Sequence, residues 1–237
     1  MPFRRAVEIV TGTTTTSAPP QQEPPMPKSL TLPEKAGVQL RLYDYLCVRR
    51  GINSSIVNTL IREGKLYEDR RGNVVFVGFD EQNKPRFACI RGTYGDYRGD
   101  CAGSDKLYSF NTVACMPSER LYVYESAIDL MSHASIEIAK TGDSEAWKQH
   151  SRISLAGTSD RALPFFLNQH KAVKELRFCL DNDQAGRKAA VHLSSEYADK
   201  GYFTRIDSPV NKDFNEDLLA FKQQIKSSKR ANQYAEL

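Results

Sequence analysis

The chain has 237 residues, of which 40% are hydrophobic and 26% charged, and its formal net charge is +4. This composition is ordinary for one globular domain or two small ones, and no apolar run approaches the length that spans a bilayer. The start of the chain lacks the apolar core of a signal peptide. The five cysteines form no Cys-x-x-Cys pair, so we expect a reduced, cytoplasmic protein without bound zinc. Without a spanning run or a signal peptide, we expect no membrane contact.

The first part of the chain divides into two short segments. In residues 1–12, apolar side chains recur from Phe3 to Val10 and Gly12 follows as a stop, as in the last turns of a helix. Twelve residues cannot bury a core alone. Residues 13–36 are rich in threonine and proline, so we expect an extended or disordered linker there.

Residues 37–118 predict a small α+β domain. Helical periodicity covers residues 37–62, Gly51 interrupts it, and Asn53 or Ser54 can cap a second helix. The first of these helices has a predicted apolar stripe of Leu40, Tyr43, Leu46 and Cys47. Two alternating apolar runs, 73–79 and 86–91, flank the polar turn 80–84, which predicts a β-hairpin.

A glycine-rich stretch follows this hairpin, from Gly92 to Lys106. It interleaves tyrosines with basic side chains, a composition that suits contact with a nucleic-acid phosphate backbone. The candidate contacts are Arg86, Arg91, Arg98 and Lys106. An ordinary surface loop with turn glycines explains the same residues, and the small basic excess of this half of the chain does not separate the two interpretations.

From residue 121 onward, short apolar runs alternate with helical patterns. The predicted strands are 121–124, 153–156, 176–180 and 203–206, and helices are predicted over about 159–170, over 184–197 and from Phe214. Strands that alternate with helices predict right-handed crossovers and a parallel sheet flanked by helices, which is an α/β fold.

Acidic residues follow two of these strands. Asp181 and Asp183 come after the run 176–180, and Glu125, with Asp129 four residues later, comes after 121–124. Because ligands of open α/β sheets bind at the carboxyl ends of the strands, we expect these carboxylates to gather there. Several carboxylate oxygens suit a hard cation such as Mg²⁺ or Mn²⁺.

Asp181-Asn182-Asp183 has two other interpretations. Asp183 is also a suitable N-cap for the following helix. A calcium-binding loop begins in the same way, but Ala185 and His192 occupy positions that must supply ligands in such a loop, so we reject it.

Three motifs together resemble Toprim domains over roughly residues 119–225. The stretch from Leu121 to Asp129 resembles the first motif of these domains, a strand followed by a glutamate and a second acidic residue. Asp181-Asn-Asp183 resembles the Toprim Asp-x-Asp motif, and Lys212-Asp213 is similar to the Lys-Asp segment near the end of these domains in primases. The resemblance implies a Toprim-type parallel sheet.

The region upstream resembles the domain of unknown function that precedes Toprim in proteins of bacterial mobile elements, and, more loosely, the start of the primase catalytic core. Residues 1–12 resemble the last helix of a CHC-type zinc ribbon whose ligands would lie upstream. The expected organisation is therefore a zinc-ribbon-like helix (1–12), a linker (13–36), an α+β domain (37–118), a Toprim domain (119–225) and a tail (226–237).

The resemblance implies roles for individual residues. Glu125 would act as a general acid or base, and Asp181 and Asp183 would hold Mg²⁺ or Mn²⁺. Asp129 and Asp213 would complete the acidic cluster, and Lys212 would contact a triphosphate or the DNA backbone.

Three functions are compatible with these residues. The first is a primase-like nucleotidyltransferase that serves the replication or transfer of a mobile element. It would use a single-stranded DNA template and nucleoside triphosphates, with a helicase or relaxase as candidate partner. The second is a metal-dependent nuclease, and the third is a non-catalytic nucleic-acid-binding accessory protein.

Overall fold

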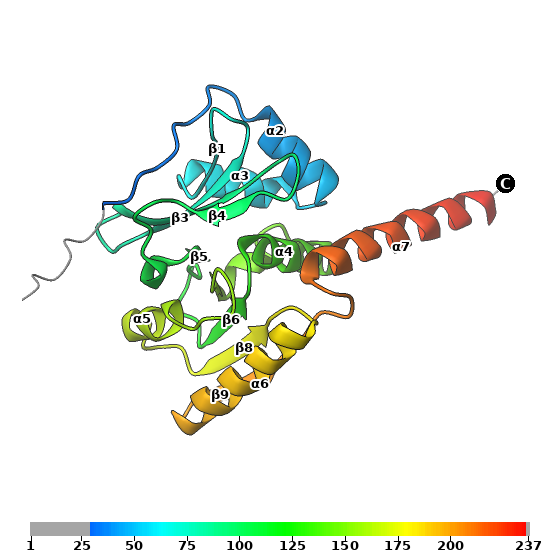
Figure 1. The fold of residues 1–237 in the computed structure, drawn as a ribbon. Helices are drawn as coiled ribbons and strands as arrows, with labels where there is room; N and C mark the ends of the chain where they lie inside the picture. Colours follow the sequence, from blue (N-terminus) through cyan, green and yellow to red (C-terminus); the bar gives the residue numbers. More distant parts are fainter. Residues whose placement is uncertain (1–28, 236–237) are drawn as a thin grey trace, which may run out of the picture.

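The computed structural model describes residues 29–235, with the side chains of residues 29–228, and contains two β-sheets joined by a shared core (Figure 1). The predicted helix of residues 1–12 and most of the predicted linker lie outside the described residues. None of the described helices is long and apolar enough to cross a membrane.

The first sheet is antiparallel and has the order β1-β2-β3-β4. Its strands are β1 (Leu66–Glu68), β2 (Val74–Phe79), β3 (Pro85–Arg91) and β4 (Arg98–Asp100). The predicted hairpin is confirmed as β2 and β3, which pair from Val74 opposite Arg91 to Phe79 opposite Pro85. The two outer strands have three residues each and show no alternation long enough to be recognised in the sequence.

One helical layer covers one face of this sheet. It consists of α2 (Leu40–Tyr43), the π-helical segment η1 (Asp44–Arg49) and α3 (Ser54–Arg62). Asn53 caps α3 as predicted, because its side chain accepts a hydrogen bond from the backbone N–H of Ser55 at 2.9 Å.

The predicted apolar stripe of the first helix is partly wrong. Leu40 is 74% exposed, whereas Leu42, Tyr45 and Leu46 are buried. In η1 the backbone N–H of Arg50 donates to the carbonyl of Tyr45, an i→i+5 bond. Leu42, Tyr45 and Leu46 are nevertheless spaced i, i+3, i+4, so the helical period is as predicted and the stripe is displaced, with Leu46 common to the predicted and the observed stripe.

The opposite face of the first sheet is covered by residues 29–36. Leu30 and Leu32 pack on that face, and the Tyr67 hydroxyl donates a hydrogen bond to the carbonyl of Pro33 at 2.8 Å. These residues are extended, as predicted. They are nevertheless part of the packed structure and not a free linker, because the apolar side of the sheet needs a cover.

The second sheet has the order β5-β7-β6-β8-β9. Its strands are β5 (Asn111–Thr112), β6 (Arg120–Tyr124), β7 (Ser151–Ser154), β8 (Glu175–Cys179) and β9 (Phe203–Ile206). The four longer strands are parallel, which confirms the predicted α/β architecture. The edge strand β5 is antiparallel and comes from upstream of the predicted boundary at residue 118.

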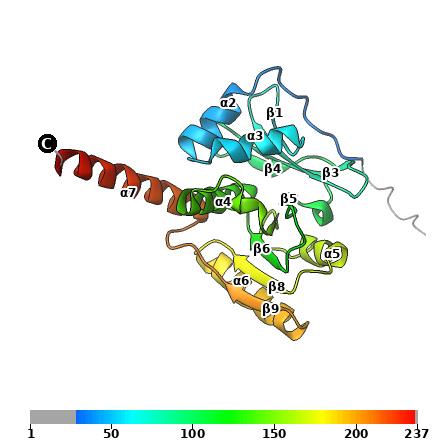
Figure 2. The same ribbon diagram turned by 180° about the vertical axis from the view of Figure 1, so that it is seen from behind.

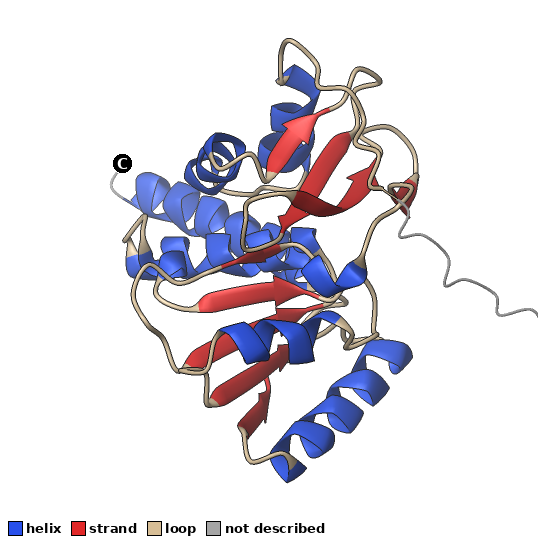
Figure 3. Cartoon of the chain, turned by 90° about the vertical axis from the view of Figure 1, so that its left-hand side faces the viewer, coloured by secondary structure: helices blue, strands red, loops and turns tan. Residues whose placement is uncertain are grey.

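Helices cover both faces of the second sheet (Figures 2 and 3). One face packs against α5 (Ala162–Gln169) and α6 (Gln184–Asp199), and the other packs against α4 (Ala127–Thr141) and the start of α7 (Phe214–Ala235). The rest of α7 projects away from the body of the molecule (Figure 1) and continues past the predicted boundary at residue 225.

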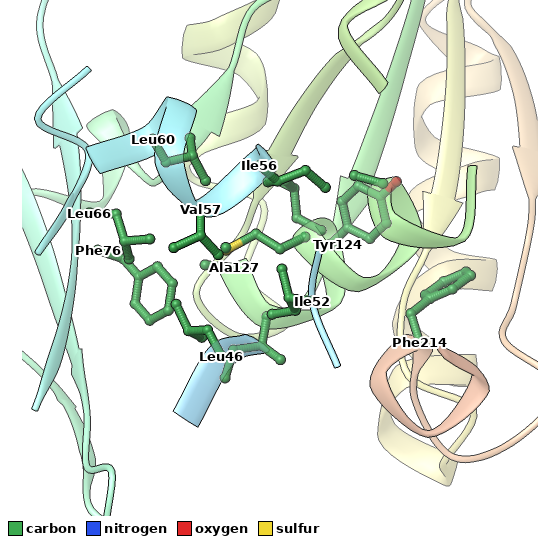
Figure 4. Close-up of a cluster of buried hydrophobic side chains, with 14 of the residues drawn as sticks. Leu46, Ile52, Ile56, Val57, Leu60, Leu66, Phe76, Tyr124, Ala127 and Phe214 are labelled. Carbon is green, nitrogen blue, oxygen red and sulfur yellow. The ribbon is translucent and has the colours of Figure 1, made fainter. Parts of the chain in front are cut away.

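A single hydrophobic core joins the two sheets. Figure 4 shows Leu46, Val57 and Phe76 of the first region in one cluster with Tyr124 and Ala127 of the second. Because well-packed interiors resist deformation, this core fixes the position of the first sheet relative to the carboxyl ends of β6 and β8.

Candidate active site

Two neighbouring parallel strands carry acidic residues just beyond their ends. In β6 and β8, Tyr124 lies opposite Cys179. Glu125 follows β6 directly and Asp181 follows β8 by two residues. The predicted convergence of these carboxylates at the carboxyl edge of the second sheet is therefore present in the backbone arrangement.

Asp129 is held at this edge by the beginning of α4. Ser126 is the N-cap of the helix, and its hydroxyl donates to the Asp129 carboxylate at 2.5 Å. Asp129 is buried, and burial, followed by repulsion from Asp181, raises its pKa to about 7. The serine three residues before an acidic residue is a capping-box pattern, so this pair could have been recognised from the sequence.

Asp183 begins α6. It is the N-cap residue, and its Oδ1 accepts a hydrogen bond from the backbone N–H of Gly186 at 2.8 Å. Gly186 lies so close to the end of β8 that a Cβ there would be 2.1 Å from the carbonyl oxygen of Asp181. The capping interpretation of Asp183 is thus confirmed, and one oxygen of its carboxylate stays outside this bond.

The loop before α7 brings Lys212 and Asp213 to the same edge. The carbonyl of Lys212 accepts a hydrogen bond from the backbone N–H of Asn182 at 2.7 Å. The Asp213 carboxylate accepts from the backbone N–H of Glu216 at 2.8 Å, which satisfies one free donor of the first helical turn. Two segments far apart in the chain are thereby joined beside Asp181.

Repulsion and burial dominate the electrostatics of this edge. Burial, followed by the charges of Glu125 and Asp213, raises the pKa of Asp181 to about 7. The pKa of Glu125 is raised by burial and then by Asp183 and Asp129, whereas Arg98 and Lys212 lower it. Neither Glu125 nor Asp181 has a side-chain hydrogen bond or ion pair within the described residues.

The acidic groups fit a divalent cation in donor chemistry but do not form a finished ligand set. Carboxylate oxygens are the ligands that Mg²⁺ and Mn²⁺ prefer, and a cation relieves the repulsion that raises these pKa values. Among the side chains that the structure describes, however, no three His, Cys, Asp or Glu residues lie close enough together to hold a metal ion. Glu125 and Asp181 are the residues available to hold one.

A cleft of about 360 Å³ opens beside Glu125, between the two sheets. One wall belongs to the first sheet and includes Arg91 and Arg98, which lie directly opposite each other across β3 and β4. Like charges in this position destabilise a sheet. In the described part of the chain neither arginine has an acidic partner, so an anion between them would be stabilised.

The other two predicted basic contacts are already engaged. Arg86 pairs with Asp80 at 3.4 Å, lies over the ring of Tyr108, and does not line the cleft. The Lys106 ammonium pairs with Asp100 at 3.3 Å and donates to the carbonyl of Ala156 at 3.0 Å, and both of these residues line the cleft.

The loop after β7 is a part of the site that the sequence did not indicate. The backbone N–H of Gly157 donates to the carbonyl of Glu125 at 3.0 Å. Its φ is 128°, and the preceding Ala156 has a φ of 52°, a left-handed conformation that is uncommon for alanine. The pair Ala156-Gly157 gives no catalytic motif by itself.

A buried ionic network lies behind Glu125 and was also not predicted. The fully buried Arg152 donates to the Tyr124 hydroxyl at 2.8 Å and to the carboxylate of Glu137. His133 hydrogen-bonds to the same hydroxyl at 2.6 Å, and burial lowers its pKa to about 3. This network fixes the end of β6.

A second polar contact ties the first region to the start of α7. Arg50 donates to the side-chain oxygen of Asn215 at 3.0 Å, and the amide nitrogen of Asn215 donates to the carbonyl of Arg50 at 2.7 Å and to Ser132 at 3.0 Å. Because Asn215 follows Asp213 closely in the chain, these bonds hold the acidic edge against the first region.

Comparison with known families agrees with the two regions of the fold. Residues 122–218 match the family model described as Toprim-like, and residues 44–114 match the model described as a protein of unknown function, DUF3991. An uncharacterized protein of Bacillus anthracis is 25% identical over 163 residues, covering 62% of this chain and 44% of that protein. The chain thus spans less than half the length of this relative.

Solved structures with a similar arrangement include two primases. The primase fragment of the bacteriophage T7 primase-helicase protein aligns with a TM-score of 0.48 and 16% identity, over 76% of this chain and 72% of that one. The Aquifex aeolicus primase, with its zinc-binding and RNA polymerase domains, aligns with a TM-score of 0.49 and 16% identity, over 76% and 53%. At these values the likeness carries no conclusion about activity.

Proposed function

The chain carries a Toprim-like domain preceded by a DUF3991 domain, and we propose that it is a metal-dependent nucleotidyltransferase of primase type that acts on DNA. The expected substrates are a single-stranded DNA template and nucleoside triphosphates. A role in the replication or transfer of a bacterial mobile element, with a helicase or relaxase as partner, belongs to this proposal and rests on the sequence resemblance.

One observation carries the proposal. Glu125 and Asp181 follow adjacent parallel strands and form no ion pair in the described part of the chain, and Glu125 lines a cleft whose other wall carries Arg91 and Arg98. Carboxylates without an ion pair suit a bound cation, and arginines without an ion pair suit a bound phosphate. Phosphodiester chemistry uses both kinds of group, because a metal ion and basic side chains stabilise the charge on the reacting phosphate.

Each residue has a role in this proposal. Glu125 and Asp181 would hold Mg²⁺ or Mn²⁺, with oxygens of the substrate phosphates completing the coordination, while Asp183, Asp129 and Asp213 keep the edge acidic. When bound, the ion would stabilise charge on the attacking and leaving oxygens. Glu125 lines the cleft at the end of β6, where its carboxylate would accept the proton of an attacking hydroxyl.

The basic side chains would bind the phosphates. Arg91 and Arg98 form a pair that can orient one phosphate group, and Lys212 lowers the pKa of both Glu125 and Asp181, which places its charge near the reacting groups. An α+β domain before the Toprim domain is the order of primases, and this order favours nucleotidyl transfer over nuclease activity.

The test is incorporation of labelled nucleoside triphosphates on single-stranded DNA with Mg²⁺ or Mn²⁺. We expect incorporation by the wild type, none by Asp181→Asn, and undiminished incorporation by the control Asp199→Asn, which alters an acidic residue at the far end of α6. Cleavage of labelled DNA without incorporation would establish a nuclease instead. DNA binding without either reaction would establish an accessory protein.

A further inference from the structure

An exposed tyrosine in the first region has two guanidinium groups close to its ring. Tyr94 is 71% exposed and belongs to the turn between β3 and β4. The guanidinium carbon of Arg41 lies 5.6 Å from its ring centroid, and that of Arg49 lies 5.3 Å away. Arg41 belongs to α2 and Arg49 to η1, whereas Tyr94 belongs to the turn after β3. The cluster therefore forms only when this helical segment packs beside the turn.

The fold holds both arginines in place. Arg41 lies against Gly72, where a Cβ would come within 2.5 Å of its side chain, and it donates to the carbonyl of Arg71 at 3.4 Å. Arg49 pairs with Asp44 at 3.2 Å and lies 5.2 Å from the centroid of the Tyr45 ring. The glycine at position 72, with φ of 82°, leaves the room that Arg41 fills.

The turn that carries Tyr94 is continuous with the cleft. Its two ends are Arg91 and Arg98, which face each other across the ladder and line the cleft beside Glu125. The backbone N–H of Gly92 donates to the carbonyl of Tyr97 at 2.8 Å and closes the turn. The turn therefore connects the arginine pair of the cleft with Tyr94.

We propose that Tyr94, Arg41 and Arg49 form a stacking platform for a single-stranded nucleic acid that extends out of the cleft. This inference rests on the proposed function, and it assigns nucleic-acid binding to the first region of the chain. A base can stack on an aromatic ring or a guanidinium plane whatever its sequence, and Arg41, which forms no ion pair within the described residues, supplies a positive charge for the neighbouring phosphates.

The surrounding surface offers a second type of partner. Leu40 and Val48 are exposed on α2 and η1, and apolar side chains with arginine and tyrosine also occur at protein interfaces. The nucleic acid is favoured because the turn that carries Tyr94 begins and ends at the basic residues of the cleft, Arg91 and Arg98.

The experiment measures binding of fluorescent oligothymidylates of about 5 and about 20 nucleotides to the full chain by anisotropy. We expect Tyr94→Ala to weaken binding of the longer strand about tenfold and that of the shorter strand much less. Tyr94→Phe keeps the ring and should bind as the wild type does. Arg41→Ala should reduce the salt dependence of binding by about 0.7 in the log–log slope for each phosphate that the arginine neutralises.

The matched control is Phe203→Ala, which removes an aromatic side chain that is 77% exposed on the edge strand β9, and it should leave binding unchanged. Equal binding of the longer strand by the wild type and Tyr94→Ala would overturn the platform while the proposed function stands, and would leave this surface to a protein partner. Equal losses for Tyr94→Phe and Tyr94→Ala would also overturn it, because stacking needs the ring alone. Failure of the wild type to bind either strand would overturn the proposed function itself.

Discussion

Two clusters of ionisable side chains lie near Tyr124, and they differ in whether their charges are paired within the protein. In the interior, the charge of Arg152 is matched by Glu137, the Tyr124 hydroxyl and the carbonyl of Trp147. At the edge, Glu125 and Asp181 are repelled by other carboxylates and form no ion pair among the described residues, although the charge of Lys212 lowers the pKa of both.

This difference separates charges that serve the fold from charges that are available to a ligand. A buried charge is tolerated only when it is paired and hydrogen-bonded, and the Arg152 cluster meets this condition. The edge does not, so the protein without a bound cation carries a repulsion that a cation would relieve. Substitutions in the two clusters test this distinction.

The largest effect is expected at the edge. Asp181→Asn removes a metal-holding charge and should lower metal-dependent turnover by about a thousandfold or more, equivalent to ~4 kcal/mol in transition-state stabilisation. Its unfolding free energy without metal should stay equal or rise, because a repelling charge is gone. Nucleotide incorporation and urea denaturation measure the two quantities, and marked destabilisation would show that Asp181 serves the fold.

The opposite result is expected in the interior. Arg152→Ala leaves Glu137 partly buried without its partner and should lower the unfolding free energy by about 3–5 kcal/mol. The double substitution Arg152→Met with Glu137→Leu removes both charges and should recover much of that loss. If the double variant is no more stable than Arg152→Ala in urea, the charge pairing is not the source of the stability.

The pH dependence of the unfolding free energy tests a buried carboxyl group of the acidic edge. The pKa of Asp129 is about 7 in the folded protein, compared with ~4 in an unfolded chain. The folded protein therefore retains a proton that the unfolded chain releases, so this group's contribution is present below pH ~4 and is lost as the pH rises to ~7.

Asp129→Asn should flatten this fall, which we expect to be about 4 kcal/mol in the metal-free protein for a pKa raised from ~4 to about 7. The measurement is the difference in unfolding free energy between the wild type and the variant at several pH values, which cancels contributions of other groups. A difference that does not change with pH would contradict the raised pKa.

The smallest effect is expected for Asp183, which serves both the fold and the edge. Asp183→Ala removes an N-cap and should cost about 1 kcal/mol of stability, whereas Asp183→Asn retains the cap and should leave stability unchanged. If Asp183 also holds the cation, calorimetric titration with Mg²⁺ should show weaker binding for the asparagine variant. Unchanged Mg²⁺ binding would leave Asp183 as a cap alone.

Much of the second sheet could be predicted because its strands and helices are long enough to carry their own periodicity. β6, β8 and β9 lie within a residue of their predicted bounds. β7 is displaced by two residues toward the start of the chain, because Leu155 and Ala156 continue the apolar run after the strand has ended. In β5, a two-residue edge strand, no local pattern could form.

The candidate site divides in the same way. The residues after β6 and β8 could be predicted, since a parallel sheet places consecutive strand ends on one edge. The opposed arginines could not be paired in advance, because the register of β3 and β4 depends on the turn between them. Arg86 shows the converse: its charge suggested a nucleic-acid contact, but the nearby Asp80 and Tyr108 engage it.

The sequence by itself determined which residues follow the parallel strands, because the spacing of nearby hydrophobic residues predicts where strands and helices alternate. Only the tertiary structure decided which charges are compensated. Arg152 of β7 meets Glu137 of α4, and Tyr94 of the turn after β3 meets Arg41 of α2. Such pairings depend on how sheets and helices pack, and no local pattern in the chain encodes them.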